Sequence, residues 1–172
     1  MSRKKCLMAL IVMILTLGLV SSLSAVNGKS NRATLRGLAG VGVLVEELPG
    51  EVEVEGLTRN QLQKDMESRL RGAGIKVLTR EECQKTPGEP YLYINVNVNI
   101  AKTESDVYPY SIDAVLIQKV SLLRNPKLTT YAVTWSSGGV GSIAKEIVGQ
   151  LAGNVEGIVD LFIKAFLSEN PK

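Results

Sequence analysis

Hydrophobic and polar residues alternate with a period of two over residues 91–101. Successive side chains of a strand point to opposite faces of its sheet, so this segment predicts a strand with one buried face. The apolar positions of the alternation are Leu92, Ile94, Val96, Val98 and Ile100. The side chains predicted on the other, polar face are those of Tyr91, Tyr93, Asn95, Asn97 and Asn99.

Four further segments are predicted as strands. Residues 38–45 are apolar on both sides, which is typical of a buried strand, and residues 75–78 form a second, short one. Residues 110–123 and 129–136 are predicted to follow the alternating strand as a meander. We expect the glycine-rich residues 137–141 to end the last of these strands.

Two segments have the three- and four-residue apolar spacing of an amphipathic helix. The first follows Thr58, which forms a capping box with Gln61, and its apolar stripe consists of Leu62, Met66, Leu70 and Ala73. The second is predicted to begin after Ser142 and to end before residues 170–171, with apolar positions at Ile143, Ile147, Leu151, Val155, Ile158, Phe162 and Phe166. A second capping box, over residues 79–82, predicts a short helical turn.

These elements predict an α/β (α+β) fold with the order β-α-β-β-β-β-α. Each long helix has one apolar stripe and each long strand has one strongly apolar face. The packing that buries both is a two-layer domain, with two helices on one face of a mixed five-stranded sheet. We expect a single domain over residues 35–168, a flexible lead-in over residues 26–34 and a tail over residues 169–172.

Residues 1–25 have the pattern of a secretory signal peptide. Basic residues at positions 3–5 precede an uncharged apolar run, and small residues follow it at positions 21–25. We therefore expect a cleaved leader and a periplasmic or secreted protein whose mature chain begins near Val26. The alternative is an uncleaved leader, in which residues 6–28 anchor the protein in the inner membrane.

The basic residues of the leader account for the net positive charge. The chain has 20 Lys and Arg against 17 Asp and Glu, and removing the three leader residues leaves 17 of each sign. Nucleic-acid binding needs a clustered positive field, so nucleic acid is not an expected partner. The absence of histidine excludes Ser-His-Asp triads, Cys-His dyads and histidine metal ligands. We expect neither a cofactor nor a metal.

Two residues are candidates for chemistry of their own. Cys83 is the only cysteine after the leader, and its acidic neighbours Glu81 and Glu82 do not favour the thiolate. We therefore expect a half-buried thiol on a short helix. Asp113 lies in an apolar strand, where a carboxylate can have a raised pKa, but the polar positions around it predict a solvated sheet surface.

The glycines of the chain do not predict a nucleotide site. Residues 139–144 match the spacing G-x-G-x-x-A, but no second βαβ unit with a terminal acid follows them. We interpret them as a flexible turn between a strand and a helix. Gly37, Gly40 and Gly42 are interpreted as sites where two backbones approach closely within a strand.

The order of elements over residues 35–168 resembles the small N-terminal domain of TolB and related envelope domains, which have an anticodon-binding-like fold. In detail the chain resembles a family of uncharacterised secreted bacterial proteins. The segments that suggest this family are Gly56-Leu57-Thr58, the arginine- and glycine-containing run to Gly74-Ile75, Pro90-Tyr91-Leu92-Tyr93 with Asn95 and Asn97, Thr134-Trp135 and Asn170-Pro171. The resemblance implies a docking module rather than a particular catalytic residue.

The leading expectation is a non-enzymatic binding or assembly module of the periplasm or envelope. Its partner is expected to be another envelope protein or a second copy of the chain, with membrane contact only through an uncleaved leader. The expected binding surface is the polar face of the alternating strand, from Tyr91 to Asn99. The alternative is a small secreted hydrolase or thiol-dependent enzyme that uses Cys83 or Asp113.

Overall fold

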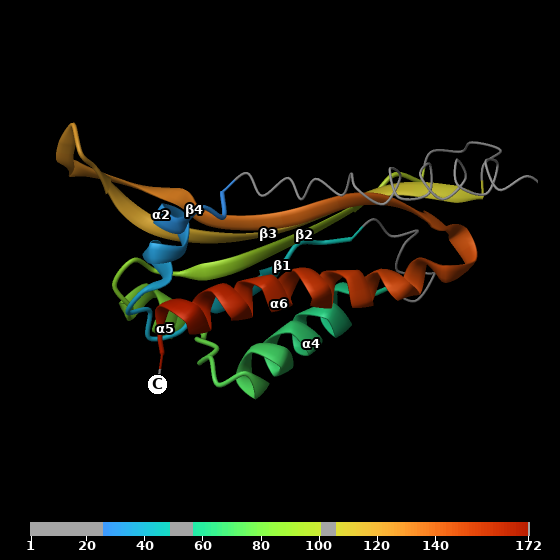
Figure 1. The fold of residues 1–172 in the computed structure, drawn as a ribbon, viewed down its shortest axis with the longest axis horizontal. Helices are drawn as coiled ribbons and strands as arrows, with labels where there is room; N and C mark the ends of the chain where they lie inside the picture. Colours follow the sequence, from blue (N-terminus) through green and yellow to red (C-terminus); the bar gives the residue numbers. More distant parts are fainter. Residues whose placement is uncertain (1–25, 49–56, 101–105, 172) are drawn as a thin grey trace, which may run out of the picture.

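A four-stranded sheet and two long helices form the two layers of the chain (Figure 1). The computed structural model describes residues 26–48, 57–100 and 106–171. The fold is α+β, with spatial strand order β1-β2-β3-β4. The strands are β1 (Gly42–Val45), β2 (Tyr91–Val98), β3 (Val107–Leu122) and β4 (Asn125–Ala144). The helices are α2 (Lys29–Arg32), η1 (Ala33–Leu35), α4 (Arg59–Gly72), α5 (Arg80–Lys85), η2 (Lys145–Gln150) and α6 (Leu151–Glu169).

The sheet is mixed, as predicted, but within the described residues it has four strands rather than five. β1 is parallel to β2, while β2, β3 and β4 form an antiparallel meander. Residues 75–78 pair with the rest of the sheet only through a parallel bridge between Val41 and Val77. The pairing is so short because Gly74, at φ +80°, turns the chain out of α4, and Thr79 already caps α5.

The prediction that residues 137–141 break the last strand is wrong. β4 continues through all of them, because their glycines make room for side chains of β3 that lie across the strand. A Cβ atom on Gly138 would lie 2.4 Å from Oδ1 of Asp113, and one on Gly141 would lie 2.7 Å from the Tyr110 hydroxyl oxygen. The match to G-x-G-x-x-A is therefore neither a nucleotide loop nor a turn, but part of a strand.

The last helix begins later than predicted, because β4 continues beyond residues 137–141. Ser142 and Ile143 belong to β4, and α6 begins only at Leu151, after η2. The predicted end before Asn170 is confirmed. The capping box predicted at Thr79 is confirmed, since both hydrogen bonds of the Thr79–Glu82 box are present. At Thr58 the cap is confirmed but the box is not: the Thr58 side chain accepts a hydrogen bond from the backbone N–H of Gln61 at 3.2 Å, whereas the Gln61 side chain donates to Asp65 at 2.7 Å.

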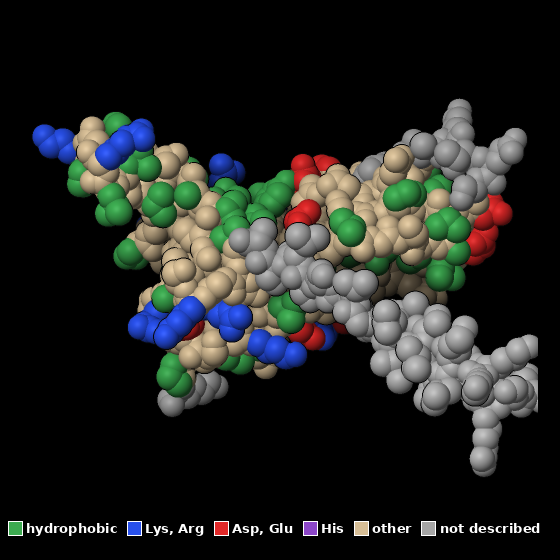
Figure 2. All heavy atoms as spheres, turned by 45° about the horizontal axis from the view of Figure 1, so that its top comes forward, with side chains coloured by type: hydrophobic (Ala, Val, Ile, Leu, Met, Phe, Trp, Pro, Cys, Tyr) green, Lys and Arg blue, Asp and Glu red, His purple; other side chains and the backbone are tan. Residues whose placement is uncertain are grey.

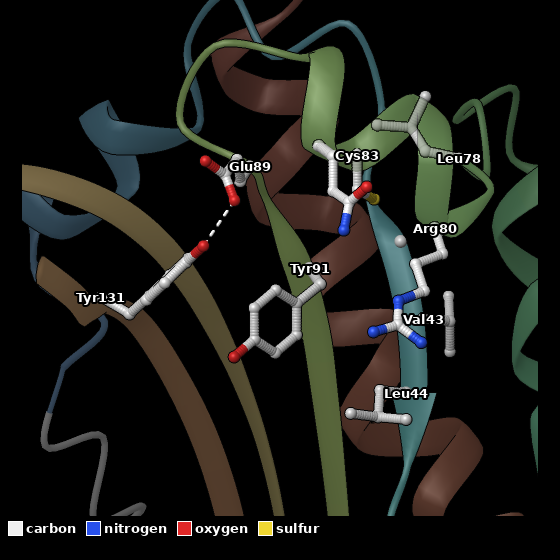
Figure 3. Close-up of a pocket in the computed structure, with 10 residues that line it drawn as sticks. Val43, Leu44, Leu78, Arg80, Cys83, Glu89, Tyr91 and Tyr131 are labelled. Atoms are coloured by element: carbon white, nitrogen blue, oxygen red, sulfur yellow. Dashed lines mark hydrogen bonds between the residues drawn. The ribbon is translucent and has the colours of Figure 1, made fainter.

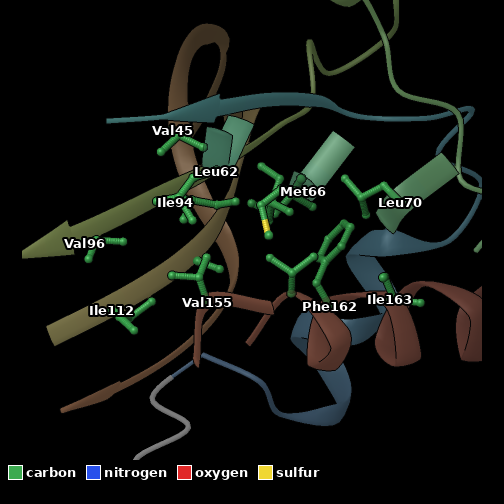
Figure 4. Packing of buried hydrophobic residues seen from close by; sticks show 14 of the residues in the cluster. Val45, Leu62, Met66, Leu70, Ile94, Val96, Ile112, Val155, Phe162 and Ile163 are labelled. Atoms are coloured by element: carbon green, nitrogen blue, oxygen red, sulfur yellow. The ribbon is translucent and has the colours of Figure 1, made fainter. Parts of the chain in front are cut away.

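The hydrophobic core lies between the sheet and the helices α4 and α6 (Figure 4). α4 contributes Leu62, Met66 and Leu70, all buried. α6 contributes a wider stripe, consisting of Leu151, Val155, Val159, Phe162, Ile163, Ala165 and Phe166. Phe162 packs edge-on against Trp135 of β4, with ring centroids 5.2 Å apart. Both long helices therefore cover the same face of the sheet.

The segment predicted as a flexible lead-in, residues 26–34, contains α2 and the start of η1. It lies along β4, where the backbone oxygen of Val26 accepts a hydrogen bond from the N–H of Ser136 at 3.0 Å. The Trp135 indole donates to Oδ1 of Asn27 at 3.0 Å, and the Asn31 amide donates to the Thr134 carbonyl at 3.1 Å. These contacts provide hydrogen-bond partners for polar groups of β4 that have no partner within the sheet.

Across the described residues, no helix combines the length and hydropathy needed to cross a bilayer. The predicted signal peptide, residues 1–25, lies outside the described residues.

Candidate functional site

The side of the sheet opposite α4 and α6 has no long described helix on it (Figure 1). The short helix α5 borders this side at one end of β1, where Cys83 lies beside Gly42. On β2 the alternation places Leu92, Ile94, Val96 and Val98 in the core. The predicted site residues lie on the other side, with Tyr91, Tyr93 and Asn95 half-buried and Asn97 and Asn99 exposed. We call this side the open face.

Strand register extends the open face beyond the residues predicted from sequence. Tyr91 lies opposite Ile117, which in turn lies opposite Val133, and Tyr93 lies between Leu44 and Val115. The resulting apolar patch consists of Leu44, Tyr91, Tyr93, Val115, Ile117, Tyr131 and Val133. Figure 2 shows hydrophobic side chains gathered on this side of the molecule. Three of them are substantially exposed, Leu44 at 42%, Val133 at 46% and Tyr131 at 52%.

A hollow of about 500 Å³ lies at one end of the open face, where α5, β1, β2 and β4 meet (Figure 3). Its walls include Leu44, Arg80, Cys83, Glu89, Tyr91 and Tyr131. In Figure 3 the Tyr91 ring lies between Tyr131 on one side and Arg80 and Leu44 on the other. We call this the Tyr91 hollow. Among its residues, only Tyr91 and Cys83 are candidate site residues in the sequence analysis.

Glu89 fixes the position of Tyr131 in the wall of the hollow. Its carboxylate accepts hydrogen bonds from the Lys119 ammonium at 2.7 Å and from the Tyr131 hydroxyl. The Lys119 hydrogen bond, followed by the Tyr131 one, lowers the pKa of Glu89 below its ordinary value. Glu89 has φ +42°, in a turn that also contains Gly88 at φ +83°. The turn thus aims a charged side chain at β3 and β4.

Arg80 is the unpaired cation among the described residues that line the Tyr91 hollow. It makes no ion pair within the described part of the chain, whereas Lys119 is already paired with Glu89. Its side chain lies beside the Leu44 and Tyr91 side chains in Figure 3. Within the described residues, the hollow therefore combines apolar walls with one unpaired positive charge.

Cys83 is a half-buried thiol on the short helix α5, as predicted. Burial raises the pKa of the thiol, the nearby Glu82 charge raises it further, and the Gly42 N–H opposes both. The Cys83 Sγ donates a hydrogen bond to the Pro90 carbonyl at 3.5 Å. A thiol that is neutral and hydrogen-bonded as a donor is a weak nucleophile.

A chain of hydrogen bonds runs along the middle of the open face. Glu46 accepts from the Asn95 side-chain amide, and the Asn97 amide donates to Oδ1 of Asn95. A hydrogen bond between Tyr93 and Glu46, aided by desolvation, raises the pKa of the Tyr93 phenol to about 12. Asn95 and Asn97 are therefore oriented by neighbours rather than free to rotate.

The phenol of Tyr93 should ionise near pH 12 instead of its ordinary 10.0. Between these values the folded state keeps a proton that the unfolded chain has lost, so the contribution of this phenol to stability is constant below pH 10 and is lost as the pH rises toward 12. The difference between the ultraviolet titration curves of the wild type and of Tyr93→Phe isolates the ionisation of this phenol. Glu46→Ala should bring its pKa back toward 10.0, and an unchanged titration would show that Glu46 does not hold it.

A second, shallower hollow of about 530 Å³ lies at the opposite end of the open face. Its walls include Asn97, Asn99, Tyr110 and Val140. The predicted surface from Tyr91 to Asn99 therefore spans the distance between two hollows. Asp113 is exposed on the same face, opposite Asn95, but it lines neither hollow and is not brought together with Cys83.

No group of three or more Cys, Asp or Glu side chains with metal-binding geometry occurs within the ranges that the structure describes. No protein-family model and no curated protein matches the chain. The geometry of the open face and its two hollows is therefore the basis for a functional proposal.

Proposed function

We propose that the chain is a non-enzymatic binding module of the cell envelope that receives an extended segment of a partner protein along its open face. The observation that carries this proposal is an uncovered sheet face bearing the apolar patch and ending in the Tyr91 hollow. Protein interfaces are enriched in tyrosine at their buried centre and have a polar rim. The patch and the Asn95–Asn97–Glu46 chain have this arrangement.

The chemistry of the hollow specifies part of the ligand. An apolar side chain of the partner would pack between Tyr91 and Tyr131, where two rigid rings offer contact area at low entropic cost. A carboxylate next to it would pair with Arg80, which makes no ion pair with any described residue. Asn95 and Asn97 would exchange hydrogen bonds with the backbone of the segment.

The environment of Cys83 weighs against the alternative of a thiol-dependent enzyme. The pKa of the thiol is raised by burial, and its S–H donates a hydrogen bond to the Pro90 carbonyl rather than to a side-chain base. Asp113, the other candidate of that alternative, lies apart from Cys83 and outside both hollows.

The test uses the native partner, captured in cells by a photo-crosslinking residue placed at Val133 and identified by mass spectrometry. Purified partner is then titrated with wild type and with the double variant Asn95→Ser/Asn97→Ser. We expect the variant to keep its melting temperature within about 2 °C and to lose at least tenfold in affinity, since two oriented amides are removed.

The matched control is Asn60→Ser, an exposed asparagine on α4 in the helix layer, which should bind like wild type. Unchanged affinity of the double variant would overturn the proposal. A large fall in its melting temperature would show instead that the amides serve the fold.

A further inference from the structure

The end of the β3–β4 hairpin projects beyond the rest of the molecule (Figure 1). Every residue from 123 to 131 is exposed. At about 3.3 Å per residue, the four residues from Lys119 to Leu123 carry the turn about 13 Å past the Glu89–Lys119 ion pair. We call residues 122–128 the hairpin tip.

The hairpin tip ends in exposed leucines. Leu123 is 99% exposed and Leu128 is 51% exposed. Leu123 and Arg124 form the two-residue turn itself, because Leu122 pairs with Asn125. Such turns ordinarily use glycine, asparagine or aspartate. Neither turn residue has a positive φ, and Leu123 contributes nothing to the core, so the fold does not require a leucine at the apex.

The charge around these leucines has one sign only. Residues 114–145 contain no Asp or Glu, and their charged residues are Lys119, Arg124, Lys127 and Lys145. Arg124 and Lys127 lie between the two leucines in the sequence and make no ion pair with any described residue. The tip is therefore cationic, although the charges of the chain after the leader balance.

This combination fits a lipid surface better than a protein groove. Leucines at the apex can enter the boundary between headgroups and acyl chains, while the long stems of Arg124 and Lys127 keep their charges at the phosphates. A protein interface of ordinary size needs roughly 800 Å² from each partner, which a narrow two-stranded tip does not offer. Docking on an anionic bilayer requires contact with the apex alone.

We propose that the hairpin tip docks the protein on a bilayer that contains anionic phospholipid. Leu123 and Leu128 enter the headgroup–acyl boundary, and Arg124 and Lys127 bind the phosphates. This contact involves no residue of the predicted leader and leaves the open face free for a protein partner. The proposal does not depend on the proposed function.

The first test is vesicle flotation of the full chain, with vesicles of phosphatidylcholine alone or mixed equally with phosphatidylglycerol. We expect tighter binding to the mixed vesicles and weaker binding in high salt. Leu123→Ser/Leu128→Ser and Arg124→Gln/Lys127→Gln should each lower the partition coefficient roughly tenfold or more, because each removes apolar area or two phosphate contacts. The leader is common to all variants, so the differences report on the tip.

The matched control is Leu161→Ser/Lys164→Gln on α6, which removes an exposed leucine and a lysine from the helix layer and should bind like wild type. A second measurement places an environment-sensitive fluorophore on Leu123→Cys in a Cys6→Ser/Cys83→Ser background. Its emission should shift to the blue with the mixed vesicles and stay unchanged with phosphatidylcholine alone. An unshifted label, or equal shifts with both vesicle types, would overturn the proposal. Equal binding by the tip variants with a label that shifts only with the mixed vesicles would mean that the leader dominates partition while the tip still contacts the bilayer.

Discussion

Phe162→Ala should lower the free energy of unfolding by about 3–5 kcal/mol. Phe162 is fully buried between the two layers, edge-on to Trp135 at 5.2 Å and tilted against Phe166 at 6.0 Å. Removing its ring forfeits the transfer free energy of the side chain and leaves a cavity that two rigid aromatic neighbours cannot fill. Denaturant unfolding followed by circular dichroism measures the loss, with an unchanged m-value showing that the unfolded state is the same.

Leu161→Ala is the matched control for this prediction. Leu161 precedes Phe162 on α6 but points to solvent and is 43% exposed. Its loss should change stability by about 0.5 kcal/mol or less. Equal losses at the two positions would mean that α6 does not bury the stripe that contains Phe162.

Residues whose pattern is local could be predicted from the sequence. The caps at Thr58 and Thr79 depend only on residues three positions away, and both are present. The faces of β2 follow from an uninterrupted alternation, and the helix α4 follows from its stripe. These features can be predicted without knowing which strand or helix packs against them.

The pairing of β4 shows where local patterns stop being sufficient. By alternation Tyr131, Val133 and Trp135 should share one face, but the register shifts so that Ile117 pairs with Val133 and Leu116 with Trp135. The irregularity turns Trp135 into the core and leaves Tyr131 and Val133 on the open face. An inserted residue of this kind depends on the partner strand, and nothing in residues 129–136 alone indicates it.

The candidate site is predicted only in part for a related reason. Tyr91 to Asn99 could be assigned to one face because they belong to one strand. Arg80, Glu89 and Tyr131 come from a helix, a turn and another strand, and only the tertiary fold brings them to the Tyr91 hollow. For Glu89 the sequence contains only a weak signal, which is the glycine before it. Gly88 permits the positive φ that the turn requires, but a glycine alone does not indicate where the next side chain points.

Of the glycines interpreted as sites of close backbone approach, Gly37 is not one, because it has φ +76° and nothing lies within 4 Å of a Cβ added there. Gly40 is such a site, and this leads to a second large effect. A Cβ atom at position 40 would lie 2.4 Å from the Lys76 carbonyl oxygen, 3.0 Å from the Lys76 Cβ and 3.2 Å from Cδ2 of Leu78. The same carbonyl accepts the Val41 N–H at 3.0 Å, so a shift of the backbone weakens the Val41–Val77 bridge. Gly40→Ala should therefore cost about 1–3 kcal/mol of unfolding free energy.

The matched control for Gly40→Ala is Gly139→Ala in β4, where no atom lies within 4 Å of the added Cβ. This variant should be neutral or slightly stabilising, because alanine restricts the unfolded chain more than glycine does. Both are measured by denaturant unfolding. The Gly40 variant should also perturb the Tyr91 hollow, because the bridge precedes β1 and β1 supplies Leu44 to its wall. If Gly40→Ala changed the free energy of unfolding as little as Gly139→Ala does, residues 75–78 would not be packed against the start of β1. The positions of Leu44 and Leu78 in the wall of the Tyr91 hollow would then be wrong.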